Sequence, residues 1–178
     1  MAFSTDVEST MASRCLIVAN QTLGGDALDR AVQDCIARDV QLFYVLAPMT
    51  RVEYETTAWT GGFGIGDVGW MPEDAIEEVM EEDARRHEVK LAEARRRAQE
   101  RLDRMIQKVE SLGGQAEGEV GIEDPLEATR GVLDRETSFT EIIVSTLPSG
   151  LSRWVKMDLP NRIARTTDIP VTTVEAKG

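Results

Sequence analysis

The chain has 178 residues, 32 of them acidic and 20 basic, which gives a formal net charge of −12 at pH 7. This charge disfavours sequence-independent binding to nucleic acid and to anionic membrane surfaces, both of which attract basic proteins. The length suits one well-buried domain, and no apolar run is long enough to span a bilayer. We therefore expect a cytoplasmic protein with neither nucleic acid nor membrane as a partner.

The first elements form a strand, a helix and a strand. Residues 1–13 lack the basic start and apolar core of a signal peptide and are expected to be a flexible tail, with a single domain over residues 14–178. Cys15–Ala19 and Val40–Leu46 are apolar enough for buried parallel strands. Asp26 is the predicted cap of the helix between them, whose apolar stripe is Ala27, Leu28, Ala31, Val32, Cys35 and Ile36.

The two cysteines, Cys15 and Cys35, are far from any CxxC spacing. They fall in a predicted strand and a predicted helix, so we expect two buried, reduced thiols. A disulfide or a metal site is the alternative.

A glycine-rich segment, about residues 49–71, interrupts this order and contains the pattern GxGxxG at Gly64, Gly66 and Gly69. The dinucleotide fingerprint needs such glycines directly between a buried strand and a helix. Here the strand ends well before, and Pro72 precedes the next helix, so a flexible loop is the favoured interpretation. A phosphate-binding role is the alternative.

A long helix is predicted over residues 72–112, because apolar residues step by threes and fours until Gly113 and Gly114 stop the pattern. Its charges predict a solvated face with i,i+4 ion pairs, and its length predicts either a kink or a projecting N-terminal half. The only histidine, His87, is predicted to lie on that exposed face. No catalytic residue and no metal ligand is predicted, and we expect no enzyme.

The rest of the chain alternates strands and helices. Strands are predicted at Gln115–Gly121, Ile142–Val144 and Val171–Val174, and the helices between them are expected to be capped by Asp124 and Asp158. The fold class is therefore α/β, a doubly wound, Rossmann-like sheet of five parallel strands.

Three stretches of this chain resemble the universal stress protein family. Cys15–Asn20 is similar to its first strand, Glu119–Ala128 to its entry into the third helix, and Glu141–Val144 with Ile169-Pro170-Val171 to its last two strands. The resemblance covers nearly all of the chain. It implies the strand order 3-2-1-4-5, a stress-response or signalling role, and a homodimer through the C-terminal strand.

The family's nucleotide-binding members carry a G-x-x-G-x9-G-[ST] motif after the fourth strand, which this chain lacks. Ser145, Pro148 and Asp158 stand at its glycine positions, and Asn20 replaces the aspartate of the first strand. Without glycine the backbone approaches a phosphate less closely, and a carboxylate repels it. The resemblance is therefore to members that do not bind ATP.

The loop after the fourth strand nevertheless offers hydroxyl and cationic donors, so two interpretations are open. Either these groups hold an anion or nucleotide, with ATP or another adenine nucleotide as the cofactor, or the hydroxyls only satisfy local turns. For a bound ligand the predicted contacts lie at the carboxyl ends of the strands: Asn20, Gln21, Thr22, Val45, Gly121, Ser145, Thr146, Ser149, Gly150, Ser152 and Arg153.

The sequence thus predicts a universal stress protein-like module, non-enzymatic, with a degenerate nucleotide site and no cofactor. The alternative is a nucleotide-binding protein that uses an altered Ser/Gly/Arg phosphate loop. The expected partners are a second copy of the chain and a small anion.

Overall fold

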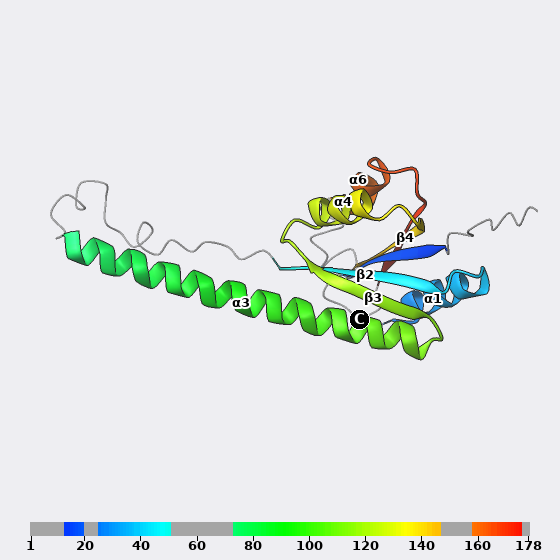
Figure 1. Ribbon diagram of the computed structural model, residues 1–178, viewed down its shortest axis with the longest axis horizontal. Coiled ribbons are helices and arrows are strands. Elements are labelled where there is room, and N and C mark those ends of the chain that lie inside the picture. The colour runs from blue at the N-terminus through cyan, green and yellow to red at the C-terminus, as the bar shows by residue number, and fades with distance from the viewer. Residues whose placement is uncertain (1–12, 20–24, 51–72, 147–157, 176–178) are drawn as a thin grey trace, which may run out of the picture.

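The computed structural model describes residues 13–19, 25–50, 73–146 and 158–175 of the chain. Five parallel strands form one sheet in the order β3-β2-β1-β4-β5 (Figure 1). This order confirms the prediction. Apolar residues that stay buried on both faces make β1 and β4 the central strands. The strands are β1 Arg14–Ala19, β2 Leu42–Pro48, β3 Gln115–Gly121, β4 Phe139–Thr146 and β5 Val171–Glu175.

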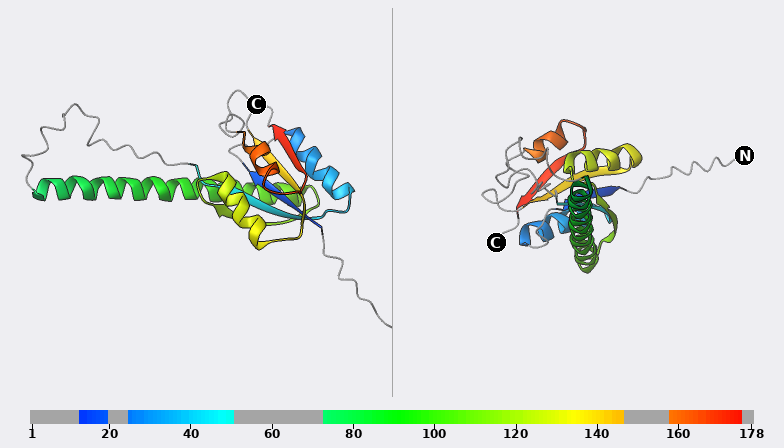
Figure 2. Two further views of the ribbon diagram at one scale, coloured as in Figure 1. Left: turned by 90° about the horizontal axis from the view of Figure 1, so that it is seen from above. Right: turned by 90° about the vertical axis from the view of Figure 1, so that its left-hand side faces the viewer.

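Helices cover both faces of the sheet, which confirms the doubly wound arrangement (Figures 1 and 2). One face carries α1 (Asp26–Ala37) and α3 (Glu73–Ser111), and the other carries α4 (Pro125–Arg135) and α6 (Leu159–Ala164). Alternate strand residues therefore enter two different cores. Ile17, Val45 and Ile143 pack on the α1–α3 side, whereas Leu16, Leu46, Ile142 and Val144 pack on the α4–α6 side.

The predicted helix caps were correct in one case of three. Asp124 caps α4, because its Oδ1 accepts hydrogen bonds from the backbone N–H groups of Leu126 (2.8 Å) and Glu127 (3.1 Å). The prediction for Asp26 was wrong, since Asp26 is already the first residue of α1. The cap position belongs to Gly25, whose φ of 148° suits glycine and which has no side chain to donate or accept.

Asp158 holds the expected cap position of α6 with a left-handed φ of 55°, but its side chain bonds no backbone N–H group of the helix. Its Oδ1 accepts instead from the Asn161 side chain at 2.5 Å.

The long helix α3 has 39 residues and runs without interruption. Its C-terminal half packs on the sheet through Ala98, Leu102, Met105 and Val109, which are all buried. The N-terminal half projects beyond the sheet, so of the two predicted outcomes the projecting helix is the correct one (Figures 1 and 2).

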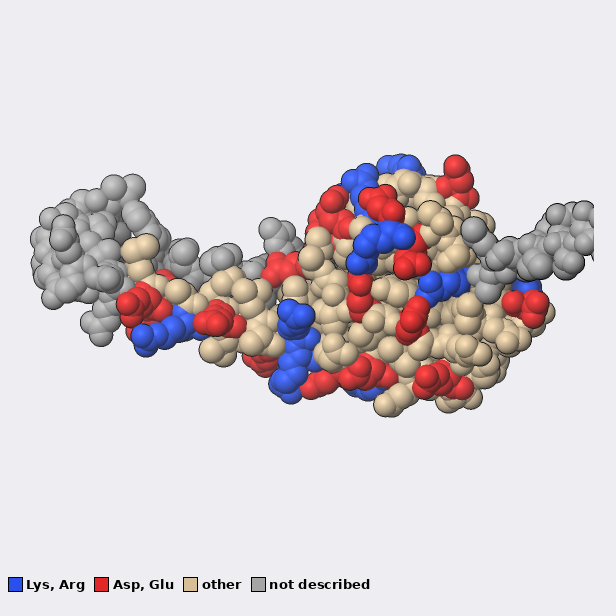
Figure 3. Space-filling model, viewed as in Figure 1, with Lys and Arg blue, Asp and Glu red and all other residues tan. Residues whose placement is uncertain are grey.

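Side chains are described from Met80 onward, and on the projecting part acidic and basic residues interleave (Figure 3). Arg85 pairs with Glu81 at 3.2 Å, Arg97 pairs with Glu93 at 2.5 Å, and Arg86 pairs with Glu82. These i,i+4 pairs follow the prediction and stabilise a solvated helix. His87 is half-buried rather than fully exposed.

Both cysteines are buried and free, as predicted. The predicted tail up to residue 12 and the glycine-rich segment from residue 51, including Gly64, Gly66 and Gly69, lie outside the described residues. Among the helices that are described, none combines the length and the apolar character that crossing a membrane requires.

Candidate functional site

The strand order places a topological switch point at β1. The chain proceeds from β1 to β2 and β3 on one side, and β4 and β5 then lie on the other side of β1. The helix that follows β1, α1, and the helix that follows β4, α6, lie on opposite faces of the sheet. Open α/β sheets bind ligands in the crevice that this divergence creates. Ala19 and Ser145, register partners on β1 and β4, mark the base of that crevice.

Four of the eleven predicted contact residues are described by the structure. Val45, Gly121, Ser145 and Thr146 all belong to strands, although only the last three stand at the carboxyl edge. The other seven predicted contacts lie outside the described residues: Asn20, Gln21, Thr22, Ser149, Gly150, Ser152 and Arg153.

Ser145 and Thr146 end β4, and both are buried, with exposed fractions of 2% and 0%. Successive strand residues face opposite sides, so Thr146 lies on the α4–α6 side with Val144 and Ile142, while Ser145 faces the α1–α3 side with Ile143. The Thr146 Oγ1 has no hydrogen-bond partner among the residues that the structure describes. A buried hydroxyl without a partner is uncommon, and it supplies an unused donor and acceptor beside the crevice.

The other two described contacts have structural explanations. Gly121 is buried, and a Cβ atom there would lie 2.8 Å from Leu46 Cδ1 and 2.9 Å from Ala128 Cβ, so only glycine lets β3 pack this closely. Its carbonyl oxygen accepts the Met49 N–H at 3.1 Å. The Val45 side chain is fully buried in the core on the α1–α3 side, three residues before β2 ends.

The helix expected to help hold an anion is short. α6 has only six residues, so its dipole is small, and Asp158 brings a carboxylate to its start. The Asp158 side chain is half exposed, and its Oδ2 is 4.0 Å from the Arg165 guanidinium. This arrangement gives an anion little attraction at the start of α6.

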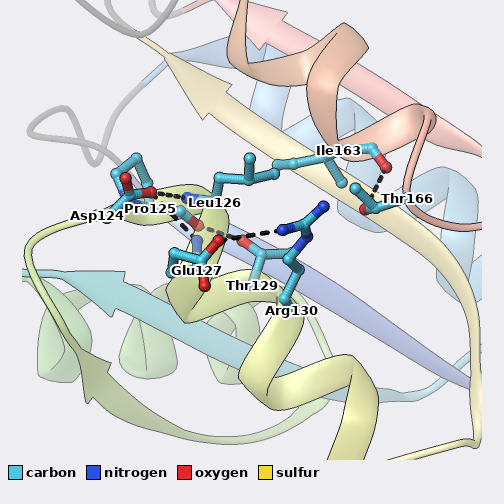
Figure 4. A network of polar contacts seen from close by, with 8 residues as sticks. All are labelled: Asp124, Pro125, Leu126, Glu127, Thr129, Arg130, Ile163 and Thr166. Carbon is cyan, nitrogen blue, oxygen red and sulfur yellow. Dashed lines mark hydrogen bonds and ion pairs between the residues drawn. The ribbon is translucent and has the colours of Figure 1, made fainter.

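A groove between α4 and α6 is lined mostly by polar residues. Figure 4 shows that polar side chains of this region bond to one another and to backbone groups of their own helices. Arg130 pairs with Glu127 at 3.1 Å. The hydroxyls of Thr129 and Thr166 donate to the carbonyl oxygens of Pro125 and Ile163, both at 2.7 Å. The contacts in Figure 4 are therefore those expected within helices, and they give no sign of a ligand site.

One charged residue near the carboxyl edge was missed by the sequence reasoning. Arg101 of α3 is buried, and its Nη2 donates to the carbonyl oxygen of Pro48, the last residue of β2, at 2.7 Å. Burial lowers the pKa of its guanidinium, and nearby Arg104 lowers it further. The missed signal was its spacing, three residues after Ala98 and four before Met105, which continues the apolar stripe of α3.

The described ranges contain no group of three or more His, Cys, Asp or Glu side chains placed to hold a metal ion.

Comparison with known proteins gave solved structures only. No protein-family model and no curated protein matches the chain. A universal stress protein from Archaeoglobus fulgidus aligns with a TM-score of 0.49 at 11% identity, over 90% of this chain and 92% of that one. The Archaeoglobus fulgidus protein in complex with dAMP aligns with a TM-score of 0.49 at 10% identity, over 92% and 98% of the two chains.

A protein of the universal stress protein family from Burkholderia pseudomallei aligns with a TM-score of 0.45 at 15% identity, over 93% and 97% of the two chains. Because these scores are below 0.5, the fold assignment rests on the strand order of the chain itself.

Proposed function

We propose that this chain is a cytoplasmic stress-response or signalling module of the universal stress type, non-enzymatic and with a degenerate nucleotide site. The supporting observation is the composition of the crevice edge at β4. Where a phosphate-binding loop would begin with glycine, the chain has Ser145, a buried strand residue in register with both Ala19 and Val174.

The chemistry of these positions opposes a triphosphate. Ser145 has strands on both sides, so the backbone there is committed to the sheet and is not free to wrap a phosphate group. Asp158 adds a carboxylate at the start of α6, at the other end of the motif. This carboxylate would repel the negatively charged phosphate groups of a nucleotide bound at the motif, even in partly solvated surroundings.

Co-purification of nucleotide tests this proposal. The protein is purified without added nucleotide and denatured, and the released small molecules are analysed by mass spectrometry. We expect no adenine nucleotide near one equivalent per chain. A stoichiometric adenine nucleotide would favour the alternative function instead.

The alternative function is nucleotide or anion binding through an altered loop. The Thr146 Oγ1 at the carboxyl end of β4, which has no partner in the described part of the chain, favours it, because a ligand oxygen would satisfy that hydroxyl. In this case the donors of the following loop, with Arg153 as the charged one, are proposed to complete the site.

We also propose that the module is a homodimer through β5. In the described part of the chain β5 pairs with β4 alone, so its outer edge is a template for a second copy. The Ile142 N–H donates to the Pro170 carbonyl oxygen, so Pro170 is one of the residues that bond toward β4. Alternate residues of a strand bond to opposite sides, and the N–H groups of Val171 and Thr173 therefore point to the free edge. A two-fold axis would make each contact twice.

A Thr173→Pro change tests the edge. It removes one outward donor from an exposed residue and, by symmetry, two hydrogen bonds from the dimer. At about 1 kcal/mol each, the dimer dissociation constant is expected to rise roughly thirty-fold. Sedimentation equilibrium measures it, with Thr173→Ala, which keeps the donor, as the matched control. A wild-type monomer at micromolar concentration, or equal association of the two variants, would refute the interface.

A further inference from the structure

Arg101 is the one charged residue that is buried in the described part of the chain. Its exposed fraction is 7%, and the other buried polar residues are the uncharged Thr129, Ser145 and Thr146. It lies on α3, which crosses the sheet below β2 and β3 (Figure 1). The contact with the Pro48 carbonyl oxygen holds its guanidinium at the carboxyl end of β2.

The hydrogen bonds of Arg101 are incomplete. Its Nη2 donates to the Pro48 carbonyl oxygen at 2.7 Å, but within the described ranges its buried Nε–H has no acceptor. Arg14, another largely covered arginine, contacts the carboxylates of Glu117 and Glu136 and has the rings of Tyr44 and Phe139 beside it.

The electrostatic surroundings of Arg101 are also unbalanced. Among the described residues no carboxylate pairs with it, and the charged neighbour that acts on it is Arg104, a second cation. Arg104 is exposed, and its Nε–H donates to the Glu100 carbonyl oxygen of the same helix. A desolvated cation without a counter-charge is unfavourable, so the buried Arg101 guanidinium, with a second cation near it, favours a bound anion.

We propose that Arg101 anchors an anion site at the carboxyl end of β2, which binds a phosphate group with Arg104 as the second cation. A guanidinium presents its N–H donors in a planar fork that matches phosphate oxygens. A phosphate group carries a charge of about −1.5 to −2 at neutral pH, which matches the charge of two arginines, whereas the single charge of one carboxylate does not. The site lies at the ligand-binding edge of the sheet.

This site is separate from the crevice between β1 and β4. Arg101 reaches the end of β2 from the α1–α3 side, whereas Thr146 faces the α4–α6 side at the end of β4. The inference therefore does not depend on adenine recognition. It concerns a phosphate group, whether free or attached to a larger molecule.

The test uses the full chain and inorganic phosphate. Arg101→Met keeps an unbranched apolar side chain and removes the charge, and Arg95→Met removes an exposed charge from the same helix as the matched control. Melting temperatures are measured over a phosphate series, with chloride keeping the ionic strength constant. A ligand that binds only the folded state raises the melting temperature in a saturable way.

The wild type and Arg95→Met are expected to respond alike. Arg101→Met is expected to need more than ten times as much phosphate for the same rise, and to melt above the wild type in chloride alone, because an unpaired buried charge has been removed. A wild type that does not respond to phosphate would overturn the proposal. So would a variant that responds as the wild type does, or one that melts lower in chloride, which would make Arg101 a structural contact with Pro48.

A second series with ribose 5-phosphate separates the two sources of the phosphate group. Saturation at a lower concentration than inorganic phosphate supports this site with an organic phosphate as its ligand, and saturation at the same concentration supports it with free phosphate. Neither probe contains adenine, so failure here is distinguishable from failure of the proposed function.

Discussion

Replacing Gly118 with alanine is expected to destabilise the protein by about 3 kcal/mol or more, because overpacking against backbone has no cheap relief. Gly118 is in the middle of β3, opposite Val45 of β2. A Cβ atom there would lie 2.0 Å from the Val45 carbonyl oxygen and 2.9 Å from Leu102 Cδ1. Either β3 moves away from β2, or α3 gives up its packing on the sheet.

Urea denaturation of Gly118→Ala and Gly131→Ala checks this expectation. Gly131 is exposed on α4, and a Cβ atom there would meet nothing within 4 Å. Alanine at position 131 is therefore expected to stabilise the protein by about 0.5–1 kcal/mol through helix propensity. A loss below 1 kcal/mol in Gly118→Ala would show that the β2–β3 pairing is looser than the register of Gly118 with Val45 implies.

Replacing Met105 with alanine is expected to cost about 2–5 kcal/mol, the usual range for a large apolar side chain removed from a core. Met105 has no exposed surface and packs between α3 and the sheet with Val109 and Phe43. It belongs to the half of α3 that holds the helix to the domain. The free energy of unfolding in urea measures the loss.

Met80 provides the matched control on the same helix. Its exposed fraction is 68%, because it lies on the projecting half of α3. Met80→Ala is expected to change the free energy of unfolding by less than about 0.5 kcal/mol, as most surface substitutions do. Similar losses at both positions would mean that the projecting half is packed as firmly as the rest.

The strands and their order could be predicted because the signals are local and strong. Cys15–Ala19 and Ile142–Val144 are unbroken apolar runs, and only central strands of a parallel sheet need them. Asp124 was also predictable, since Pro125 after it fixes where α4 begins. The order 3-2-1-4-5 came from the family resemblance, and the sheet confirms it.

The sequence predictions were wrong where backbone conformation or tertiary packing determines the structure. The start of α1 depends on a positive φ at Gly25, so Asp26 fell one position too late to be the cap. Arg101 was counted with the solvated arginines of α3, because charge suggested exposure more strongly than spacing suggested burial. Its hydrogen bond to the end of β2 joins residues far apart in the sequence, and no local pattern predicts that contact.

The position of the candidate site in the fold could be predicted from the sequence, but the contacts of its side chains could not. The switch point follows from the strand order, and Ser145 and Thr146 mark its edge. Whether the Thr146 hydroxyl finds a partner among the described residues depends on how the end of β4 packs in the fold. No local sequence pattern predicts that packing.

Calorimetric titration of the purified protein with ATP tests the degenerate site most directly. With Ser145 in the sheet and Asp158 at the start of α6, we expect no saturable binding at low micromolar ATP. If weak binding is seen at higher concentration, Arg153→Ala is expected to weaken it by roughly ten-fold or more, because a charged donor contributes about 1.5–3 kcal/mol. A low micromolar dissociation constant for the wild type would contradict the account.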